Sequence, residues 1–134
     1  RLERSSNSAM KIAKYLHEHP MVERISYPLH PSFPQYDLAK AQMKKAGGLL
    51  SFYLKASSID QCEAFFHQLK RFLLAVSWGG HESLVMPSAA FYKIPGKPDS
   101  PVPWNLFRLY IGLEEPDWLI ADLDQAFKSL EQTG

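Results

Sequence analysis

Two stretches of the sequence place polar side chains that can bind or catalyse inside apolar surroundings. The first is Arg108, which stands in the apolar run from Leu106 to Ile111. An arginine is costly to bury unless a partner compensates its charge, and its planar guanidinium suits a carboxylate held by two hydrogen bonds. Side chains along a strand alternate between its two faces. The simpler alternative is therefore that Arg108 lies on the face exposed to solvent and binds no ligand. Both interpretations predict a strand here, and they differ in what the guanidinium faces.

The second stretch runs from Ser77 to Ser83 and lies between two apolar runs. Its paired glycines, Gly79 and Gly80, allow a positive φ or a close approach of the backbone to a ligand. The serine, tryptophan and histidine beside them offer hydrogen-bond donors. The stretch therefore predicts either a binding loop or a glycine-rich turn with a packed tryptophan.

The sequence lacks the spacing of the common metal and nucleotide sites. Its five histidines include no pair with the i, i+4 spacing of a zinc helix, and Cys62 has no CxxC partner. The GxGxxG, P-loop and GxSxG motifs are absent, and the pair Gly47-Gly48 lacks the Lys-Ser/Thr of a phosphate loop. We therefore expect no metal ion, and we interpret the histidines as ordinary surface or loop residues: His17, His19, His30, His67 and His81.

Apolar periodicity and turn residues divide the chain into alternating helices and strands. Helices are predicted around Ala9 to Leu16, from about 36 to 45, after the capping box Ser58–Gln61, and from Pro116. The helix after the capping box is expected to pack on the core through Cys62, Phe65, Phe66 and Leu69. The helix from Pro116 is expected to do so through Leu119, Ile120, Leu123, Phe127 and Leu130. Strands are predicted around 22–27 and at 49–54, 72–76, 83–86 and 106–111. Proline-rich loops are predicted at 28–35 and 87–103, and the second is long enough to suggest a function. The order of elements indicates one antiparallel-rich sheet with helices packed on it, an α+β domain.

The bulk composition narrows the class of protein. The chain has 134 residues, of which 46% are hydrophobic, enough for one domain with a core of its own. A net charge of +1 gives no electrostatic reason to expect a nucleic acid or an anionic membrane as partner. No apolar run reaches the roughly 20 residues of a membrane span, and no signal peptide is visible. The single cysteine indicates a reducing compartment, so we expect a cytoplasmic protein. A start at Arg1 instead of methionine leads us to expect an excised fragment.

Several motifs, in order along the chain, resemble those of the Cys/Met metabolism enzymes that use pyridoxal phosphate (PLP). Residues 75–87 resemble their SxGGxESL…P segment, and 107–114 resemble their hRhxhGhE strand, where h is apolar. Residues 47–52 and 119–127 resemble their GGhhSF strand and their final LIxDLxxAh helix. Residues 1–28 resemble the helix and strand that open their small domain. The resemblance implies that residues 1–134 are the small C-terminal domain of a fold-type I PLP-dependent transferase, without the large PLP-binding domain.

The resemblance also implies roles for single residues. Arg108 matches the arginine that grips the α-carboxylate of the substrate, and Ser77 matches a catalytic-site serine placed to hydrogen-bond the amine of the cofactor lysine. Trp78 resembles the tryptophan of the cystathionine β-lyases, whose indole N–H adds a bond to the same carboxylate. Val76 stands at a specificity position where many γ-lyases and γ-synthases carry glutamate, and Glu82 is expected to stabilise the glycine turn. The cofactor lysine follows a serine or threonine in the family, and this chain has no such pair, so we expect no cofactor ligand in it.

The implied activity is that of a PLP-dependent carbon–sulfur lyase, most like cystathionine β-lyase, which splits cystathionine to homocysteine, pyruvate and ammonia. A γ-elimination or γ-replacement enzyme is the alternative within the family, and Val76 leaves that choice open. A non-enzymatic module that binds a small amino acid or mediates oligomer contacts is the alternative outside it. Family members are usually homotetramers built mainly through the large domain, so this chain alone is expected to be catalytically inert. A large domain upstream with a Ser/Thr-Lys pair would favour the enzyme.

Overall fold

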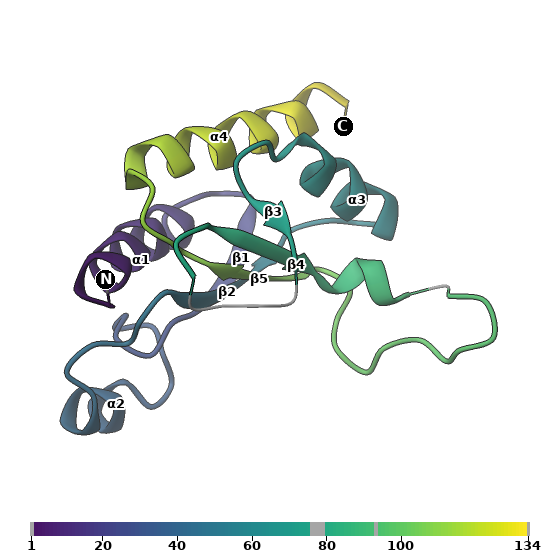
Figure 1. Cartoon of the computed structure of the whole chain (residues 1–134). Coiled ribbons are helices and arrows are strands. Elements are labelled where there is room, and N and C mark those ends of the chain that lie inside the picture. The colour runs from purple at the N-terminus through teal and green to yellow at the C-terminus, as the bar shows by residue number, and fades with distance from the viewer. Residues whose placement is uncertain (1, 76–79, 93, 134) are drawn as a thin grey trace.

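The computed structural model describes residues 2–75, 80–92 and 94–133. Within them, a five-stranded sheet carries the longer helices on one face (Figure 1). The helices are α1 (Leu2–His17), α2 (Tyr36–Gln42), α3 (Ile59–Gln68), α4 (Pro116–Thr133) and the short 3-10 helix η1 (Ser88–Phe91). The strands are β1 (Val22–Ser26), β2 (Leu49–Leu54), β3 (Leu73–Leu74), β4 (Leu84–Pro87) and β5 (Leu106–Tyr110). The α+β class predicted from the sequence is confirmed.

Strand β5 lies in the middle of the sheet, whose order is β1-β2-β5-β4-β3. It pairs antiparallel with β2 on one side and with β4 on the other, and only β3 and β4 run parallel. In this register Arg108 lies between Ser51 of β2 and Met86 of β4. A residue on a central strand has hydrogen-bonded neighbours on both sides, so its backbone is fixed more firmly than on an edge.

The core is an aromatic cluster between the sheet and helices α3 and α4. Phe52 and Phe107 stack with ring centroids 5.1 Å apart. Phe65 of α3 lies 5.3 Å from Phe107 and 4.8 Å from Phe127 of α4. Such rings each bury about 150–250 Å² and dominate core energetics. Most predicted helix-core positions are buried as expected, whereas Phe66, Leu69 and Ile120 are partly buried at the margin of the cluster.

The predicted capping box at the start of α3 is present in a modified form. The Ser58 hydroxyl accepts a hydrogen bond from Gln61 N at 3.2 Å. The Gln61 side chain returns to the backbone N–H of Ser57, not of Ser58, at 2.8 Å. Both bonds satisfy N–H groups that a helix start leaves without intrahelical partners.

Three predicted elements differ from the structure. Of the expected strand 72–76, the described residues 72–75 include only Leu73–Leu74 as strand. Phe72 turns into the core, while both leucines pair at the sheet edge with side chains about half exposed or more. The expected helix 36–45 ends at Gln42, where the following backbone is extended. The expected loop 87–103 begins with the last residue of β4 and the turn of η1.

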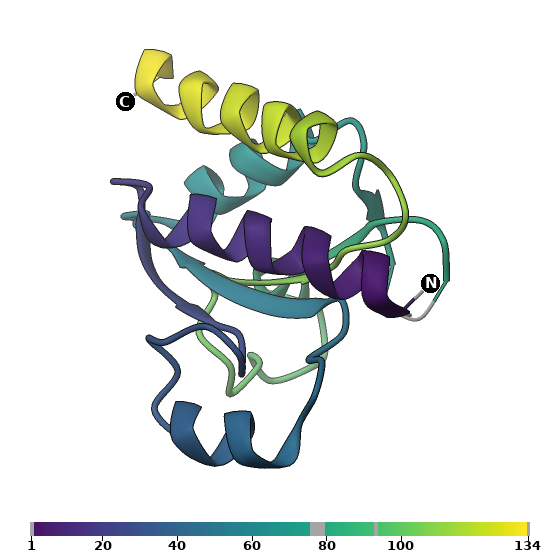
Figure 2. The same cartoon turned by 90° about the vertical axis from the view of Figure 1, so that its left-hand side faces the viewer.

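The two faces of the sheet are covered differently. Helices α1, α3 and α4 pack on one face, while the short helix α2 is set apart on the other side (Figure 2). In the ranges that the structure describes, no long helix covers this second face. The second face is therefore where a side chain on β5 can meet something other than the core.

Candidate functional site

Arg108 lies on the face of the sheet opposite the long helices. Its neighbours along β5, Phe107 and Leu109, are fully buried in the helix-covered core, so strand alternation directs Arg108 to the other face. The side chain is half-buried, and its Nη2 lies 3.9 Å from the sulfur of Met86. A half-buried guanidinium on a central strand is placed well enough to orient a carboxylate.

A second arginine on this face is engaged differently. Arg24 of β1 stacks over the ring of Tyr53, with its Cζ 4.0 Å from the ring centroid. Tyr53 lies between Arg24 and Leu106 in the sheet register. Arg24 is exposed at the side of the sheet, which makes it a useful comparison for Arg108.

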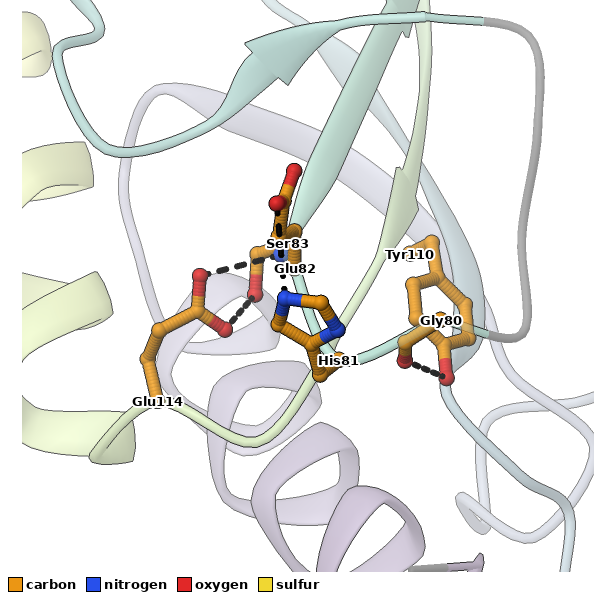
Figure 3. Close-up of polar contacts among 6 residues, drawn as sticks. All are labelled: Gly80, His81, Glu82, Ser83, Tyr110 and Glu114. Atoms are coloured by element: carbon orange, nitrogen blue, oxygen red, sulfur yellow. Dashed lines mark hydrogen bonds and ion pairs between the residues drawn. The ribbon is translucent and has the colours of Figure 1, made fainter.

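Residues 80–83 run beside the end of β5 and are tied to it by hydrogen bonds (Figure 3). The Tyr110 hydroxyl donates to the Gly80 carbonyl oxygen at 3.0 Å. The Leu113 N–H donates to the His81 carbonyl oxygen at 2.9 Å. Because Tyr110 is two residues after Arg108 on the same strand, both side chains leave the sheet on the same face. Gly80 therefore lies on the side of the sheet that carries Arg108.

The tightest polar contact in this turn joins Ser83 to Glu114. Ser83 is fully buried, and its N–H and hydroxyl donate to the two carboxylate oxygens of Glu114 at 3.0 and 2.8 Å (Figure 3). The Ser83 hydroxyl oxygen in turn accepts from the N–H of Gly112 at 2.9 Å. A Cβ at Gly112 would overlap the His81 carbonyl oxygen, so the two backbones can approach this closely only at a glycine.

The expected role of Glu82 in the glycine turn stays a prediction, because residues 76–79 of that turn lie outside the described residues. Glu82 is exposed, and its carboxylate lies 3.4 Å from the exposed His81 ring, a surface pair of little energetic weight. Among the described residues, the carboxylate that binds the end of this turn, at Ser83, belongs to Glu114. Glu114 is the last residue of the hRhxhGhE resemblance, and the sequence analysis gave it no role. The available signal was the pairing of strands 83–86 and 106–111, because their antiparallel register brings the residues before one strand next to those after the other.

Three of the predicted site residues, Val76, Ser77 and Trp78, lie outside the described residues. Their roles stay predictions. Arg108 is the one predicted site residue among the described residues. It lies on the same face of the sheet as Gly80, which follows Ser77 by three positions in the sequence.

An apolar hollow of about 310 Å³ lies next to Met86, the residue that contacts the Arg108 guanidinium. Met86 belongs both to the wall of the hollow and to the contact with the Arg108 guanidinium. The other lining residues come from the strand β3 region and from the start of the predicted functional loop: Leu74, Ala75, Pro87, Ala90 and Phe91. The guanidinium can bind a carboxylate, and the apolar hollow next to Met86 can accept an apolar side chain. This combination of a polar group and an apolar cavity is typical of small-molecule sites.

Other kinds of site find no support in the part of the chain that the structure describes. There, no three His, Cys, Asp or Glu side chains are grouped so that they could hold a metal ion. Cys62 is fully buried, and burial raises the pKa of its thiol to about 12, so it is not a thiolate nucleophile near neutral pH. No described helix has the length and apolar character needed to cross a membrane.

Comparison with known proteins identifies the family. The model of the family described as Cys/Met metabolism PLP-dependent enzyme matches residues 1–128. The chain belongs to this family.

The relatives of this family member are longer than the chain itself. It is 41% identical to cystathionine gamma-lyase of Sus scrofa over 99% of its own length, and 40% identical to L-methionine gamma-lyase of Pseudomonas deceptionensis over 97%. It spans 34% and 33% of those two proteins, about a third of each. A crystal structure from Campylobacter jejuni, described as an O-acetylhomoserine (thiol)-lyase with N'-pyridoxyl-lysine-5'-monophosphate, matches with a TM-score of 0.77 and 33% identity. That match covers 94% of this chain and 28% of the other.

The family uses PLP, which agrees with the cofactor expected from the sequence. The described residues of this chain do not fit the cofactor's attachment point. Every lysine among them is exposed on the surface, whereas a lysine that forms a Schiff base is activated by desolvation or by a neighbouring cation.

Proposed function

We propose that this chain is the substrate-orienting part of a PLP-dependent carbon–sulfur lyase that acts on a sulfur amino acid. In this proposal residues 1–134 form the small C-terminal domain of a longer protein, and PLP is held by a large domain outside them. The observation that carries the proposal is Arg108, half-buried on the sheet face opposite the long helices, in contact with Met86 of the apolar hollow. Family membership supplies the cofactor and the class of chemistry.

In the proposed site, Arg108 binds the α-carboxylate of the amino acid through its two parallel N–H donors. A carboxylate held at two points cannot rotate freely, so the Cα–H bond keeps one direction relative to the base that removes its proton. Trp78 adds an indole N–H to the same carboxylate, and Ser77 hydrogen-bonds the amine of the cofactor lysine. Val76 and the apolar hollow face the sulfur-bearing part of the substrate. The PLP bound by the large domain supplies the electron sink for the carbanion chemistry.

Two finer activities remain open to experiment, each with its own support. Cleavage of cystathionine at the β-carbon is favoured by Trp78, which resembles the tryptophan of cystathionine β-lyases. Elimination at the γ-carbon is favoured by the relatives, which are named as gamma-lyases of cystathionine and of methionine. The products distinguish the two, because β-elimination of cystathionine yields pyruvate and homocysteine, whereas γ-elimination yields 2-oxobutyrate and cysteine.

The test is an assay of the full-length protein, loaded with PLP, on L-cystathionine, L-cysteine and L-methionine. The oxo acid released and the thiol released are both identified. We expect turnover of at least one substrate, with pyruvate and homocysteine as the signature of the β-lyase. The absence of any oxo acid from all three would defeat the proposed function.

The chain by itself is proposed to be catalytically inert, which predicts a distinct result with PLP. Adding PLP to the isolated 134-residue chain should give no stable lysine-bound absorbance band, because the described lysines are exposed and lack the desolvation that activates a Schiff-base lysine. Borohydride treatment followed by peptide mapping should find trace label spread over several lysines. Stoichiometric trapping at one lysine would contradict the proposal.

Assembly and location complete the proposal. The full-length protein is proposed to be a cytoplasmic homotetramer whose contacts come mainly from the large domain. A non-enzymatic module that binds an amino acid or mediates oligomer contacts is the remaining alternative. It would be favoured if no large domain with a Ser/Thr-Lys pair preceded this chain in its reading frame.

A further inference from the structure

We infer that Glu114 is a positioning residue for Arg108, acting through Ser83 and the register of strands β4 and β5. The inference rests on the proposed function, in which Arg108 holds the substrate carboxylate. Glu114 follows Arg108 by six residues and does not itself belong to the proposed carboxylate site. Its effect on that site has to pass through the pairing of the two strands.

The chemistry of the Ser83–Glu114 contact makes it a firm anchor. Both oxygens of the Glu114 carboxylate are used, one by the Ser83 N–H and one by the Ser83 hydroxyl. The same hydroxyl accepts from Gly112, so a fully buried serine has each of its donors and its acceptor engaged. Bonds to an ionised acceptor are stronger than those between neutral groups. Removing the carboxylate would leave two donors of Ser83 without acceptors.

The position of this contact in the sheet links it to Arg108. Ser83 immediately precedes β4, and Gly112 follows shortly after the end of β5. The strands then pair as Leu84 with Tyr110 and Met86 with Arg108. The Ser83–Glu114 contact thus closes the end of the β4–β5 pair and fixes which residue of β4 lies opposite Arg108. A slip of one residue would turn the neighbouring side chain to the other face.

The shortness of β4 explains why the strand needs such an anchor. β4 spans only Leu84–Pro87, and among the described residues its outer neighbour β3 comprises only Leu73–Leu74. Proline at the end of β4 has no N–H to add to the ladder. The anchor at Ser83 compensates for this short ladder. Met86 then stays beside the guanidinium, and the apolar hollow that it lines keeps its place next to that contact.

The experiment compares variants of the full-length protein by kinetics and by hydrogen exchange. In Glu114→Ala, KM for the best substrate should rise at least about fivefold, while kcat per folded molecule changes less than about twofold. Amides in peptides covering 80–86 should exchange at least about tenfold faster, because Ser83 has no carboxylate to donate to. Peptides covering β2 (49–54) should keep their rates. Glu114→Gln, which keeps the length and one acceptor oxygen, should lie between wild type and alanine in both measurements.

Two neighbouring glutamates provide matched controls. Glu115 is exposed and pairs with exposed Arg4, and Glu82 is exposed and pairs with His81. Glu115→Ala and Glu82→Ala should leave KM and the exchange of 80–86 unchanged.

The inference is overturned if Glu114→Ala lowers kcat in proportion to the loss of folded protein with KM unaltered, since that is the result of a purely structural role. It is also overturned if exchange at 80–86 equals that of the wild type. If the wild type converts no sulfur amino acid, the proposed function fails on its own, and hydrogen exchange then decides whether Glu114 anchors β4.

Discussion

Replacing Arg108 with alanine in the full-length protein should lower kcat/KM for its sulfur amino acid at least about tenfold. Truncating one partner of a charged, hydrogen-bonded pair in a desolvated site costs about 2–5 kcal/mol, and the half-buried position of Arg108 makes the lower part of that range the relevant one. Most of the decrease should appear in substrate affinity and orientation. The absorbance of bound PLP should change little, because the cofactor is proposed to lie on the other domain. The measurements are steady-state kinetics and the visible spectrum of each variant.

Arg24 is the control for this prediction. It lies on the neighbouring part of the same sheet and is stacked on Tyr53, so Arg24→Ala removes an equal charge without touching the proposed carboxylate site. Arg24→Ala should retain kcat/KM within about twofold, since surface cation–π contacts are worth only about 0.5–1 kcal/mol. An unaltered kcat/KM for Arg108→Ala would rule out the carboxylate role.

The second large effect is expected on stability, at Asp122. This residue of α4 is 2% exposed, and its carboxylate accepts backbone hydrogen bonds from Lys70 at 3.0 Å and from Arg71 at 2.8 Å. Asp122→Ala leaves these backbone donors without their acceptor, at about 1–3 kcal/mol each when water cannot replace it. The free energy of unfolding should fall by about 2–4 kcal/mol, measured by urea denaturation of the chain.

Asp117 is the control for the stability prediction, because it lies in the same helix, is exposed, and pairs with Lys11 at the surface. Asp117→Ala should cost less than about 1 kcal/mol. Asp122→Asn, which keeps one acceptor oxygen, should fall between the two. Equal decreases for Asp117→Ala and Asp122→Ala would show that Asp122 does not hold the end of α3 to α4.

Helix starts and helix core faces could be predicted from the sequence, because each depends on residues that are close together in the chain. The capping box at Ser58 and Gln61 is visible within four residues of sequence, and the structure retains it. The core face of α4 follows from helical periodicity, and its residues Leu123 and Phe127 are buried as predicted. The α+β class followed from the order of these elements.

The missed features depend on contacts between distant parts of the chain. Asp122 binds backbone groups about 50 residues away, and Glu114 binds Ser83, 31 residues away. The hRhxhGhE resemblance includes Glu114 but does not say what its carboxylate binds, because that contact arises only when β4 pairs with β5. Of the predicted strand 72–76, the described residues form only the short β3, because apolar content predicts a strand, but Phe72 turns into the core instead of pairing with β4.

The most direct test of the role of Arg108 removes the carboxylate from the ligand as well as the arginine from the protein. Inhibition constants are measured for L-methionine and for its decarboxylated amine, 3-(methylthio)propylamine, with the wild type and with Arg108→Ala. If Arg108 binds the α-carboxylate, the wild type should prefer the amino acid at least about tenfold, and Arg108→Ala should lose most of that preference while binding the amine almost unchanged. An equal preference for the amino acid in both proteins would contradict the claim that this chain orients the substrate through Arg108.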